Sequence, residues 1–178
     1  MNTNHYTQKS LEAIQSAQQL ALAGSHQQLE QVHLLTALLE QEGGLIPQLL
    51  RKMEVVVESL TAAAKDELKK LPSVTGSREA ERMYISRSLD QTMNDAFEEA
   101  KQMGDEYVSV EHLFLGLLDT ADTTISQLLR SYRIRKENVL QALQSIRGSQ
   151  RVTSDSPEST YDALQKYGTD LVRRAREG

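Results

Sequence analysis

The chain matches itself without a gap when it is shifted by 79 residues. Residues 33–34 (His-Leu) align with residues 112–113, and residues 48–51 (Gln-Leu-Leu-Arg) align with residues 127–130. A constant offset over many positions indicates a tandem duplication. Equal patterns bury equal faces, so we expect two copies of one unit related by a pseudo-two-fold axis. The predicted copies are residues 6–71 and 84–147, within one domain at residues 1–147.

Each copy has the pattern of four helices. Apolar residues recur at three- and four-residue spacing, as Ile14, Ala17 and Ala21 do, which is typical of one face of a helix. Gly24 can end the first helix, and Pro72 ends the last helix of the first copy. No segment predicts a convincing strand, so the predicted fold class is all-α. The expected helices are residues 8–23, 31–40, a short one that includes residue 47, 57–71, 86–103, 110–118, 124–132 and 136–146.

Composition narrows the class of protein. With two Phe, six Tyr and no Trp, the core must be aliphatic, which is typical of helices packed on helices. The net charge is −5 and no basic stripe occurs, which argues against a nucleic-acid partner. The absence of Cys excludes disulfides and thiolate metal sites and fits a cytoplasmic protein. No apolar run approaches the roughly 18 residues that span a bilayer, and residues 1–10 lack the apolar segment of a secretory signal.

The amino-acid composition changes after the second copy. Residues 148–160 are rich in Gly, Ser, Thr and Asp and include Pro157, which predicts a flexible linker. Residues 161–178 place apolar side chains at helical spacing and end with Arg173, Arg174 and Arg176. An apolar helix face beyond a linker has nothing to pack against. We therefore expect a C-terminal helical tail that leads into a further part of a longer natural chain.

Two four-helix copies that each contain His-Leu-x-x-x-Leu-Leu, at residues 33–39 and 112–118, resemble the double N-terminal repeat of the Clp family of AAA+ ATPases. The Leu-Pro ending at residues 71–72 and the tail at residues 167–178 extend the resemblance over essentially the whole chain. The linker and tail look more like the disaggregase members than the protease-associated ones.

The resemblance implies a recognition module that binds unfolded or aggregated polypeptide and delivers it to the rest of its own hexameric motor. The alternative is a module that docks an adaptor protein for a Clp protease. Neither nucleic acid nor a membrane is an expected partner.

No ATPase chemistry is expected in this segment. A phosphate-binding loop needs two Gly residues five positions apart, followed by Lys and Ser or Thr, and no two Gly here have that spacing. ATP and Mg²⁺ are implied, by the resemblance, only for the full-length protein. His33 and His112 fit packed or capping histidines at equivalent helix starts better than metal ligands, which need three or four converging groups. His5 and His26 are expected to be exposed.

Asp105, Glu106 and Glu111 form an acidic cluster in the second copy. One reading is that they complement the positive N-terminal end of a helix. The other follows from the resemblance, in which Thr7, Asp105 and Glu111 match positions that handle clients. Exposed carboxylates there could hold the N–H groups or basic side chains of an extended peptide, and replacing them by Ala should leave melting nearly unchanged.

The two copies differ at the start of their second helix. The second copy has Ser109-x-Glu111-His112, whereas the first has Glu30-x-Val32-His33. The first copy therefore lacks the acidic residue, and we expect it to lack a good helix cap as well. An acidic site, if one exists, belongs to the second copy.

Apolar residues near the connector between the copies are the other part of the candidate site. Tyr84, Ile85, Leu89 and Tyr107 fit ordinary core between the repeats, and they also fit a groove for apolar client segments. On the second reading, this apolar surface carries Thr7 and the acidic residues at its edge.

Overall fold

The computed structural model describes residues 5–74, 83–148 and 150–158. Within these residues it contains eight α-helices, which confirms the all-α prediction, and each helix for which the sequence predicts both ends begins and ends within about two residues of the expected position. The tail at residues 161–178 lies outside the described residues. The first repeat contains α1 (Gln8–Ala23), α2 (Gln31–Glu40), α3 (Leu45–Lys52) and α4 (Val57–Lys69), and the second contains α5 (Arg87–Gln102), α6 (Val110–Thr120), α7 (Thr123–Ser131) and α8 (Lys136–Arg147).

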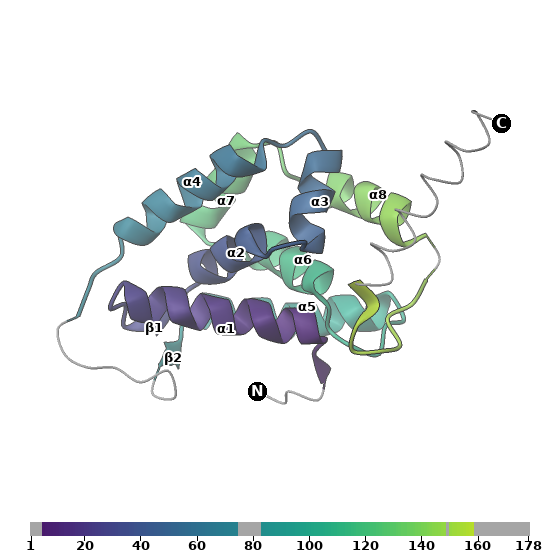
Figure 1. The fold of residues 1–178 in the computed structure, drawn as a ribbon, viewed down its shortest axis with the longest axis horizontal. Helices are drawn as coiled ribbons and strands as arrows, with labels where there is room; N and C mark the ends of the chain where they lie inside the picture. Colours follow the sequence, from purple (N-terminus) through teal and green to yellow (C-terminus); the bar gives the residue numbers. More distant parts are fainter. Residues whose placement is uncertain (1–4, 75–82, 149, 159–178) are drawn as a thin grey trace.

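Helices α2 and α6 form the centre of the fold, because nearly all of their residues are buried. Helices α1 and α5 pack on one side of this pair, and the remaining four helices cover the other side (Figure 1). The repeats interlock there, since α3 of the first repeat packs on α8 of the second and α4 packs on α7. Among the described residues, no helix is both long and apolar enough to cross a membrane.

Equivalent hydrogen bonds establish the pseudo-two-fold relation. The backbone N–H of Thr7 donates to Val108 O at 3.0 Å, and the backbone N–H of Ser86 donates to Leu29 O at 3.0 Å. The two donors, Thr7 and Ser86, are 79 residues apart, and so are the two acceptors, Leu29 and Val108. The start of the first helix in one repeat is thus joined to the loop before the second helix of the other repeat.

Backbone conformation repeats in the same way. Ser25 and Gly104 have φ values of 54° and 72°, and Glu54 and Arg133 have φ values of 65° and 58°. Each pair again follows the 79-residue offset. Two equal turns therefore end equivalent helices, although only one of the four positions carries Gly, the residue that adopts this conformation without strain.

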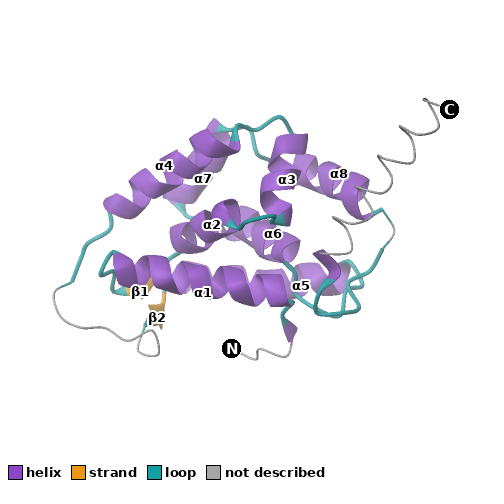
Figure 2. Cartoon of the chain, in the orientation of Figure 1, coloured by secondary structure: helices purple, strands orange, loops and turns teal. Residues whose placement is uncertain are grey.

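Two short strands correct the expectation that the chain has none (Figure 2). β1 (Gln28–Leu29) and β2 (Tyr84–Ile85) pair in parallel, with Leu29 opposite Ile85. An isolated bridge between Tyr6 and Val108 occupies the symmetry-related place. Strands of two residues are too short for an alternating pattern, and their partners lie in different repeats, so no local signal predicts them.

Residues 150–158, which the sequence predicts as part of a linker, pack against the body. The backbone N–H of Glu106 donates to Val152 O at 2.7 Å, and the backbone N–H of Gln8 donates to Asp155 O at 2.8 Å. The Val152 side chain is fully buried. Figure 1 shows this segment at the yellow end of the colour scale, beside the end of the molecule where α1 begins. These contacts are mostly hydrogen bonds of the main chain, and such hydrogen bonds cannot be predicted from amino-acid composition.

Candidate functional site

The predicted site residues lie in two places rather than on one surface. Thr7 caps the first turn of α1, with Asp105, Tyr107 and Glu111 near it, whereas Tyr84 of β2 and Leu89 at the start of α5 lie beside the middle and later part of α1 (Figure 1). Ile14 and Ala17 of α1 lie against Ile85 and Leu89, roughly 10 and 15 Å along the helix from Thr7. The acidic residues and the apolar residues are therefore at different points along α1.

Asp105 is the centre of a buried polar cluster. Its carboxylate accepts hydrogen bonds from His112 Nε2 at 2.7 Å, from Arg147 Nη1 and Nη2 at 2.9 and 2.7 Å, and from the backbone N–H of Val152 at 2.9 Å. Burial alone raises the pKa of this carboxyl, but the hydrogen bonds from His112 and Arg147 hold the pKa well below its ordinary range. Asp105 is thus an ionised anchor inside the domain.

Glu111 differs from Asp105, although the sequence places both in one acidic cluster. Its side chain is fully buried, and neither carboxylate oxygen has a hydrogen-bond partner among the described residues. Arg147 Nη1 lies 3.7 Å from Glu111 Oε2. Burial raises the pKa of Glu111 to about 7, against the opposing charges of His112 and Arg147. The equivalent residue of the first repeat is Val32, so Glu111 is a carboxyl at a core position.

Thr7 completes the polar cluster. Its Oγ1 accepts the backbone N–H of Ser10 at 3.2 Å and donates to Glu158 Oε1 at 2.8 Å. The backbone N–H of Val110 also approaches Glu158 Oε1, at 3.4 Å. Burial raises the pKa of Glu158. The name polar cluster is used below for six buried residues: Thr7, Asp105, Glu111, His112, Arg147 and Glu158.

The expectation of exposed carboxylates is wrong, because the side chains of Asp105 and Glu111 are both inaccessible to solvent. Sequence reasoning also missed Arg147 and Glu158. These residues lie 42 and 151 positions from their main partners, Asp105 and Thr7, and Glu158 is in a segment with the composition of a linker. No signal in the sequence connects them.

The histidines behave as capping residues, as the sequence predicts. His33 Nδ1 accepts the backbone N–H of Glu30 at 2.9 Å, and the Glu30 side chain accepts the backbone N–H of His33. The first copy therefore has a helix cap, contrary to expectation. Because Nδ1 of His33 is an acceptor, its Nε2 carries the proton and donates to Nδ1 of His26 at 2.8 Å.

His26 is buried rather than exposed as expected. Burial lowers the pKa of His26 and lowers the pKa of His33 to about 4, with the His26 charge contributing to the latter shift. The second repeat has the same arrangement, with Asp105 in the place of His26. His112 Nδ1 accepts the backbone N–H of Ser109 at 2.9 Å, and Nε2 donates to Asp105.

The other candidate residues form an apolar surface at the junction of the repeats. Tyr84 and Ile85 of β2 are 68% and 39% exposed, the highest exposure among large apolar residues near the junction. Leu89 is buried and lies beneath the exposed side chains. Behind Ile85 lies a small apolar pocket, and we call Tyr84, Ile85 and this pocket the junction surface. The pocket is lined by Ile14, Ala17, Leu29, Leu34, Leu89 and Met93.

The symmetry-related position is covered. Tyr6, the counterpart of Ile85, is only 3% exposed, and its ring makes an edge contact with Phe97 at 5.5 Å between centroids. The counterpart of Phe97 in the first repeat is Gln18. The junction surface thus lacks the aromatic cover that its symmetry mate has.

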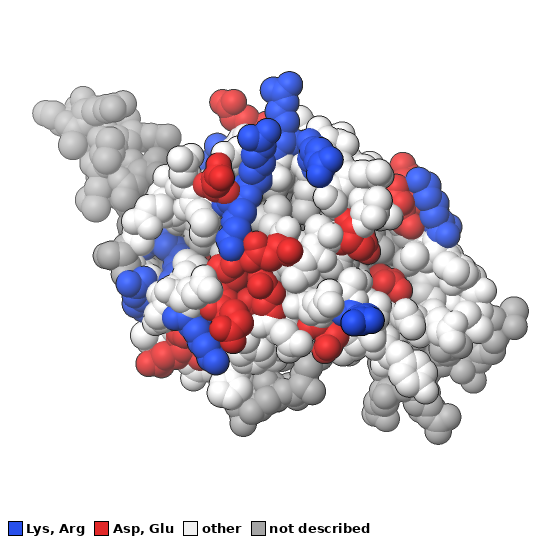
Figure 3. All heavy atoms as spheres, turned by 180° about the vertical axis from the view of Figure 1, so that it is seen from behind, with Lys and Arg blue, Asp and Glu red and all other residues white. Residues whose placement is uncertain are grey.

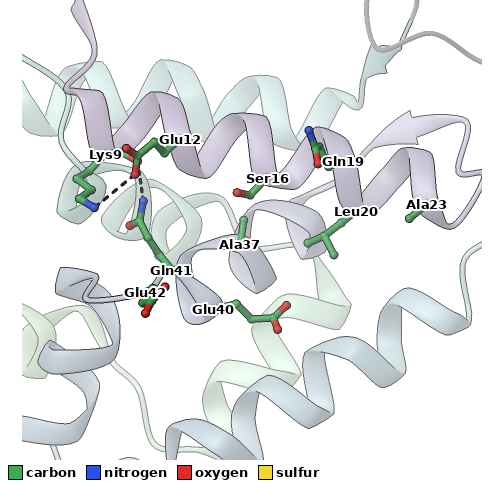
Figure 4. Close-up of a pocket in the computed structure, with 10 residues that line it drawn as sticks. All are labelled: Lys9, Glu12, Ser16, Gln19, Leu20, Ala23, Ala37, Glu40, Gln41 and Glu42. Carbon is green, nitrogen blue, oxygen red and sulfur yellow. Dashed lines mark hydrogen bonds and ion pairs between the residues drawn. The ribbon is translucent and has the colours of Figure 1, made fainter.

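A groove of about 760 Å³ runs along α1 in the first repeat (Figure 4). Its lining includes the Lys9–Glu12 ion pair, Ala37 of α2 and several further polar side chains. In the second repeat Gly116 takes the place of Ala37, and a Cβ atom there would lie 2.6 Å from Thr92 O. The missing side chain lets α6 approach α5 closely.

Acidic side chains gather on the face turned away from the viewer in Figure 1 (Figure 3). Asp95, Glu99 and Asp119 place carboxylate oxygens within 4.8 Å of one another, a set that could hold a cation. Lys136 Nζ already pairs with Glu99 and, at 3.0 Å, with Asp119. Burial, a hydrogen bond with Asp119 and the Asp119 charge raise the pKa of Asp95 to about 7. The ammonium group of Lys136 and a proton on Asp95 therefore balance the negative charge of this cluster.

Comparison with known proteins identifies the fold. The family model described as "Clp repeat (R) N-terminal domain" matches residues 5–132. The chaperone protein ClpB of Bacillus cereus is 46% identical over 179 aligned residues, which cover 100% of this chain and 21% of the relative. This chain thus spans about a fifth of the length of that chaperone.

Solved structures have the same fold. The Hsp104 N-terminal domain from Candida albicans matches with a TM-score of 0.75 and 22% identity, over 86% of this chain and 98% of that one. The ClpV N-domain, solved in complex with a VipB peptide, matches with a TM-score of 0.62 and 16% identity, over 79% and 86% of the two chains. The chain belongs to the family of Clp repeat N-terminal domains and is similar throughout to the N-terminal region of ClpB chaperones.

Proposed function

We propose that this domain binds unfolded or aggregated polypeptide and delivers it to the hexameric, ATP-driven motor of a protein disaggregase in the cytoplasm. Similarity to ClpB chaperones over the whole chain supports this proposal. ATP and Mg²⁺ would act in the motor, in a part of the longer protein beyond these residues. The domain itself would recognise clients and perform no chemistry.

The exposed apolar side chains of the junction surface carry the proposal. Tyr84 and Ile85 lie on a short strand, beside an apolar pocket. An extended peptide that adds to the edge of a strand gains main-chain hydrogen bonds whatever its sequence, and apolar contacts with the exposed Tyr84 and Ile85 side chains would add to them. A chaperone must bind many sequences, and this combination of main-chain and apolar contacts suits that task.

Weak binding by each domain is what this role requires. Six domains tethered to one hexamer raise the effective concentration of sites around a client. A single domain can then bind with a Kd on the order of micromolar to millimolar and still retain a client at the motor. Modest affinity also allows the client to leave the domain for the pore.

Replacing Tyr84 and Ile85 together by Ser tests the proposal. Fully burying one such side chain is worth about 1.5–3 kcal/mol, so we expect the Kd for a chemically unfolded, carboxymethylated protein to rise at least about tenfold. Val56 is 61% exposed and lies away from the junction, so Val56→Ser is the matched control. NMR titration of the labelled domain measures both. Equal affinities for the wild type and the double variant would refute the role of this surface.

Docking of an adaptor protein is the second candidate function. The solved ClpV N-domain has a VipB peptide bound, which is a segment of a defined partner. The two functions predict different ligands. Saturable binding of a folded adaptor, with no binding of an unfolded protein, would favour the adaptor role over client recognition.

A further inference from the structure

Residues 150–158, here called the strap, cover the polar cluster. The strap joins the loop after α5 to the start of α1: the backbone N–H of Val152 donates to Asp105, Glu106 N–H donates to Val152 O, and Gln8 N–H donates to Asp155 O. It lies beside the Tyr6–Val108 bridge, which is the symmetry mate of the strand pair at the junction surface.

The strap places an acidic side chain between two helix starts. Glu158 accepts from Thr7 Oγ1, at the N-terminal end of α1, and from the backbone N–H of Val110, at the N-terminal end of α6. Helix N-termini favour negative groups, because their first N–H groups lack partners within the helix. The strap is thus held through main-chain bonds, the buried Val152 side chain and the Glu158 carboxylate, with a bend at residues 154–155 and a helical turn at residues 157–158.

The site beneath the strap has unused binding capacity. Neither oxygen of Glu111 has a hydrogen-bond partner among the described residues, although the side chain is fully buried. Oε2 of Glu158 is also buried and has no hydrogen-bond partner among the described residues. Buried polar groups in native proteins are nearly always hydrogen-bonded, and exceptions call for a specific reason. A site that receives different ligands at different times provides such a reason.

The strap has few contacts of the kind that resist opening. Only Val152, Pro157 and Glu158 are buried, and its other residues are exposed. Val152 also lies outside the main apolar core. A segment held by main-chain hydrogen bonds near the surface and by few apolar contacts opens at low free energy.

We propose that the strap is an intrachain occupant of a second peptide site, and that a partner segment replaces it. That segment would carry an apolar residue in the place of Val152 and a carboxylate six positions later, in the place of Glu158. In the closed state the strap hides Thr7, Asp105 and Glu111, and release of the strap exposes them. The proposal deepens the proposed function and rests on it for the class of partner, a polypeptide segment.

The test opens the strap and supplies its sequence in trans. Val152→Asp puts a charge at a fully buried position, and Thr153→Asp adds the same charge at the exposed neighbour as the control. We expect V152D, but not T153D, to speed hydrogen exchange of the Gln8 and Glu106 amides at least tenfold. A labelled synthetic peptide of residues 148–160 should bind V152D at least tenfold more tightly than it binds the wild type or T153D. A peptide with Glu158→Ala should bind V152D several-fold more weakly.

Two results would overturn the proposal. One is faster exchange in V152D without any gain in peptide binding. The other is unchanged exchange, which would make the strap an inseparable part of the fold. If V152D loses its helical circular dichroism, Glu158→Ala in the chain removes the bonds to Thr7 and Val110 instead, and the same two readouts apply.

The junction surface is tested separately from the strap site. The variant with Ser at positions 84 and 85 retains the strap and its contacts. If that variant binds unfolded protein as the wild type does while V152D captures the peptide, the proposed function at the junction surface fails and the strap site stands. The reverse pattern refutes the strap site alone.

Discussion

Replacing Glu111 by Gln is expected to stabilise the domain at pH 8 and to change its stability little at pH 5. Gln has nearly the same shape as Glu but cannot ionise. Burial raises the pKa of Glu111 from its ordinary value of 4.5 to about 7. The folded state therefore keeps a proton that the unfolded state releases, so the contribution of Glu111 to stability is full below pH 4.5 and is lost as the pH rises through about 7.

The size of the effect follows from this pKa. A tenfold change in proton affinity corresponds to about 1.4 kcal/mol, so a rise from 4.5 to about 7 corresponds to roughly 3 kcal/mol lost well above pH 7. The glutamine variant avoids this loss. We expect its advantage in the free energy of unfolding to approach roughly 3 kcal/mol at pH 8 and to stay below about 1 kcal/mol at pH 5.

Asp105→Ala provides the contrast, because it should destabilise the domain at both pH values. Without Asp105, the guanidinium of Arg147 keeps a buried charge and loses its two-fold pairing. Removing one partner of a buried ion pair typically costs about 3–5 kcal/mol. Two carboxyls that the sequence groups together should therefore act in opposite directions.

Urea denaturation at pH 5 and pH 8, followed by circular dichroism, measures these changes through linear extrapolation. Comparing each variant with the wild type at the same pH cancels the contributions of the other titrating groups. A Glu111→Gln variant that is less stable than the wild type at pH 8 would refute the reasoning. It would mean that Glu111 is ionised and that its attraction to Arg147 outweighs its burial.

Three further substitutions test other parts of the structure. Gly116→Ala should lower the free energy of unfolding by about 1–3 kcal/mol, because the new Cβ meets backbone atoms of α5 and forces the two helices apart. Thermal denaturation measures this change, and an unchanged melting temperature would show that α5 and α6 are not in tight contact. Gln31→Leu should cost about 1–3 kcal/mol and speed hydrogen exchange of the Asp122 amide, whose acceptor is Gln31 Oε1 at 3.0 Å. His33 should contribute a loss of roughly 3 kcal/mol between pH 6.5 and pH 4, since burial lowers its pKa to about 4 and only the unfolded state takes up the proton readily. Urea titrations measure this contribution as the difference between the wild type and His33→Gln, which keeps a capping side chain, because the raised pKa values of Glu111 and Asp95 act in the opposite direction over the same range. A difference that does not vary with pH would place the titrating group elsewhere.

The fold and its duplication are readable from the sequence alone. The spacing of Ile14, Ala17 and Ala21 predicts α1 because helical periodicity is a local property of the chain. The 79-residue offset predicts two equal units because equal sequences adopt equal local structures. His33 and His112 were interpreted correctly as capping residues, since each acts on a backbone group only three positions away.

The candidate site was predicted less well, because its properties depend on burial and on distant partners. The sequence identified Asp105 and Glu111 but suggested nothing about their opposite states, which arise from Arg147 in α8 and from Val152 in the strap. It groups Tyr84 with the acidic residues, although Tyr84 is exposed on β2 and the acidic residues are buried in the polar cluster.

Local pattern thus determined the helices and the repeat of this protein. Only tertiary structure decided which carboxyl is paired, which is left without a partner and which apolar side chains remain exposed. The physical reason is that helix formation depends on residues within one or two turns, whereas the ionisation of a buried group depends on its desolvation and on charges brought close by the fold. His26 and Asp105 occupy equivalent positions in the two repeats, and their different surroundings give one a neutral ring and the other an ionised carboxylate.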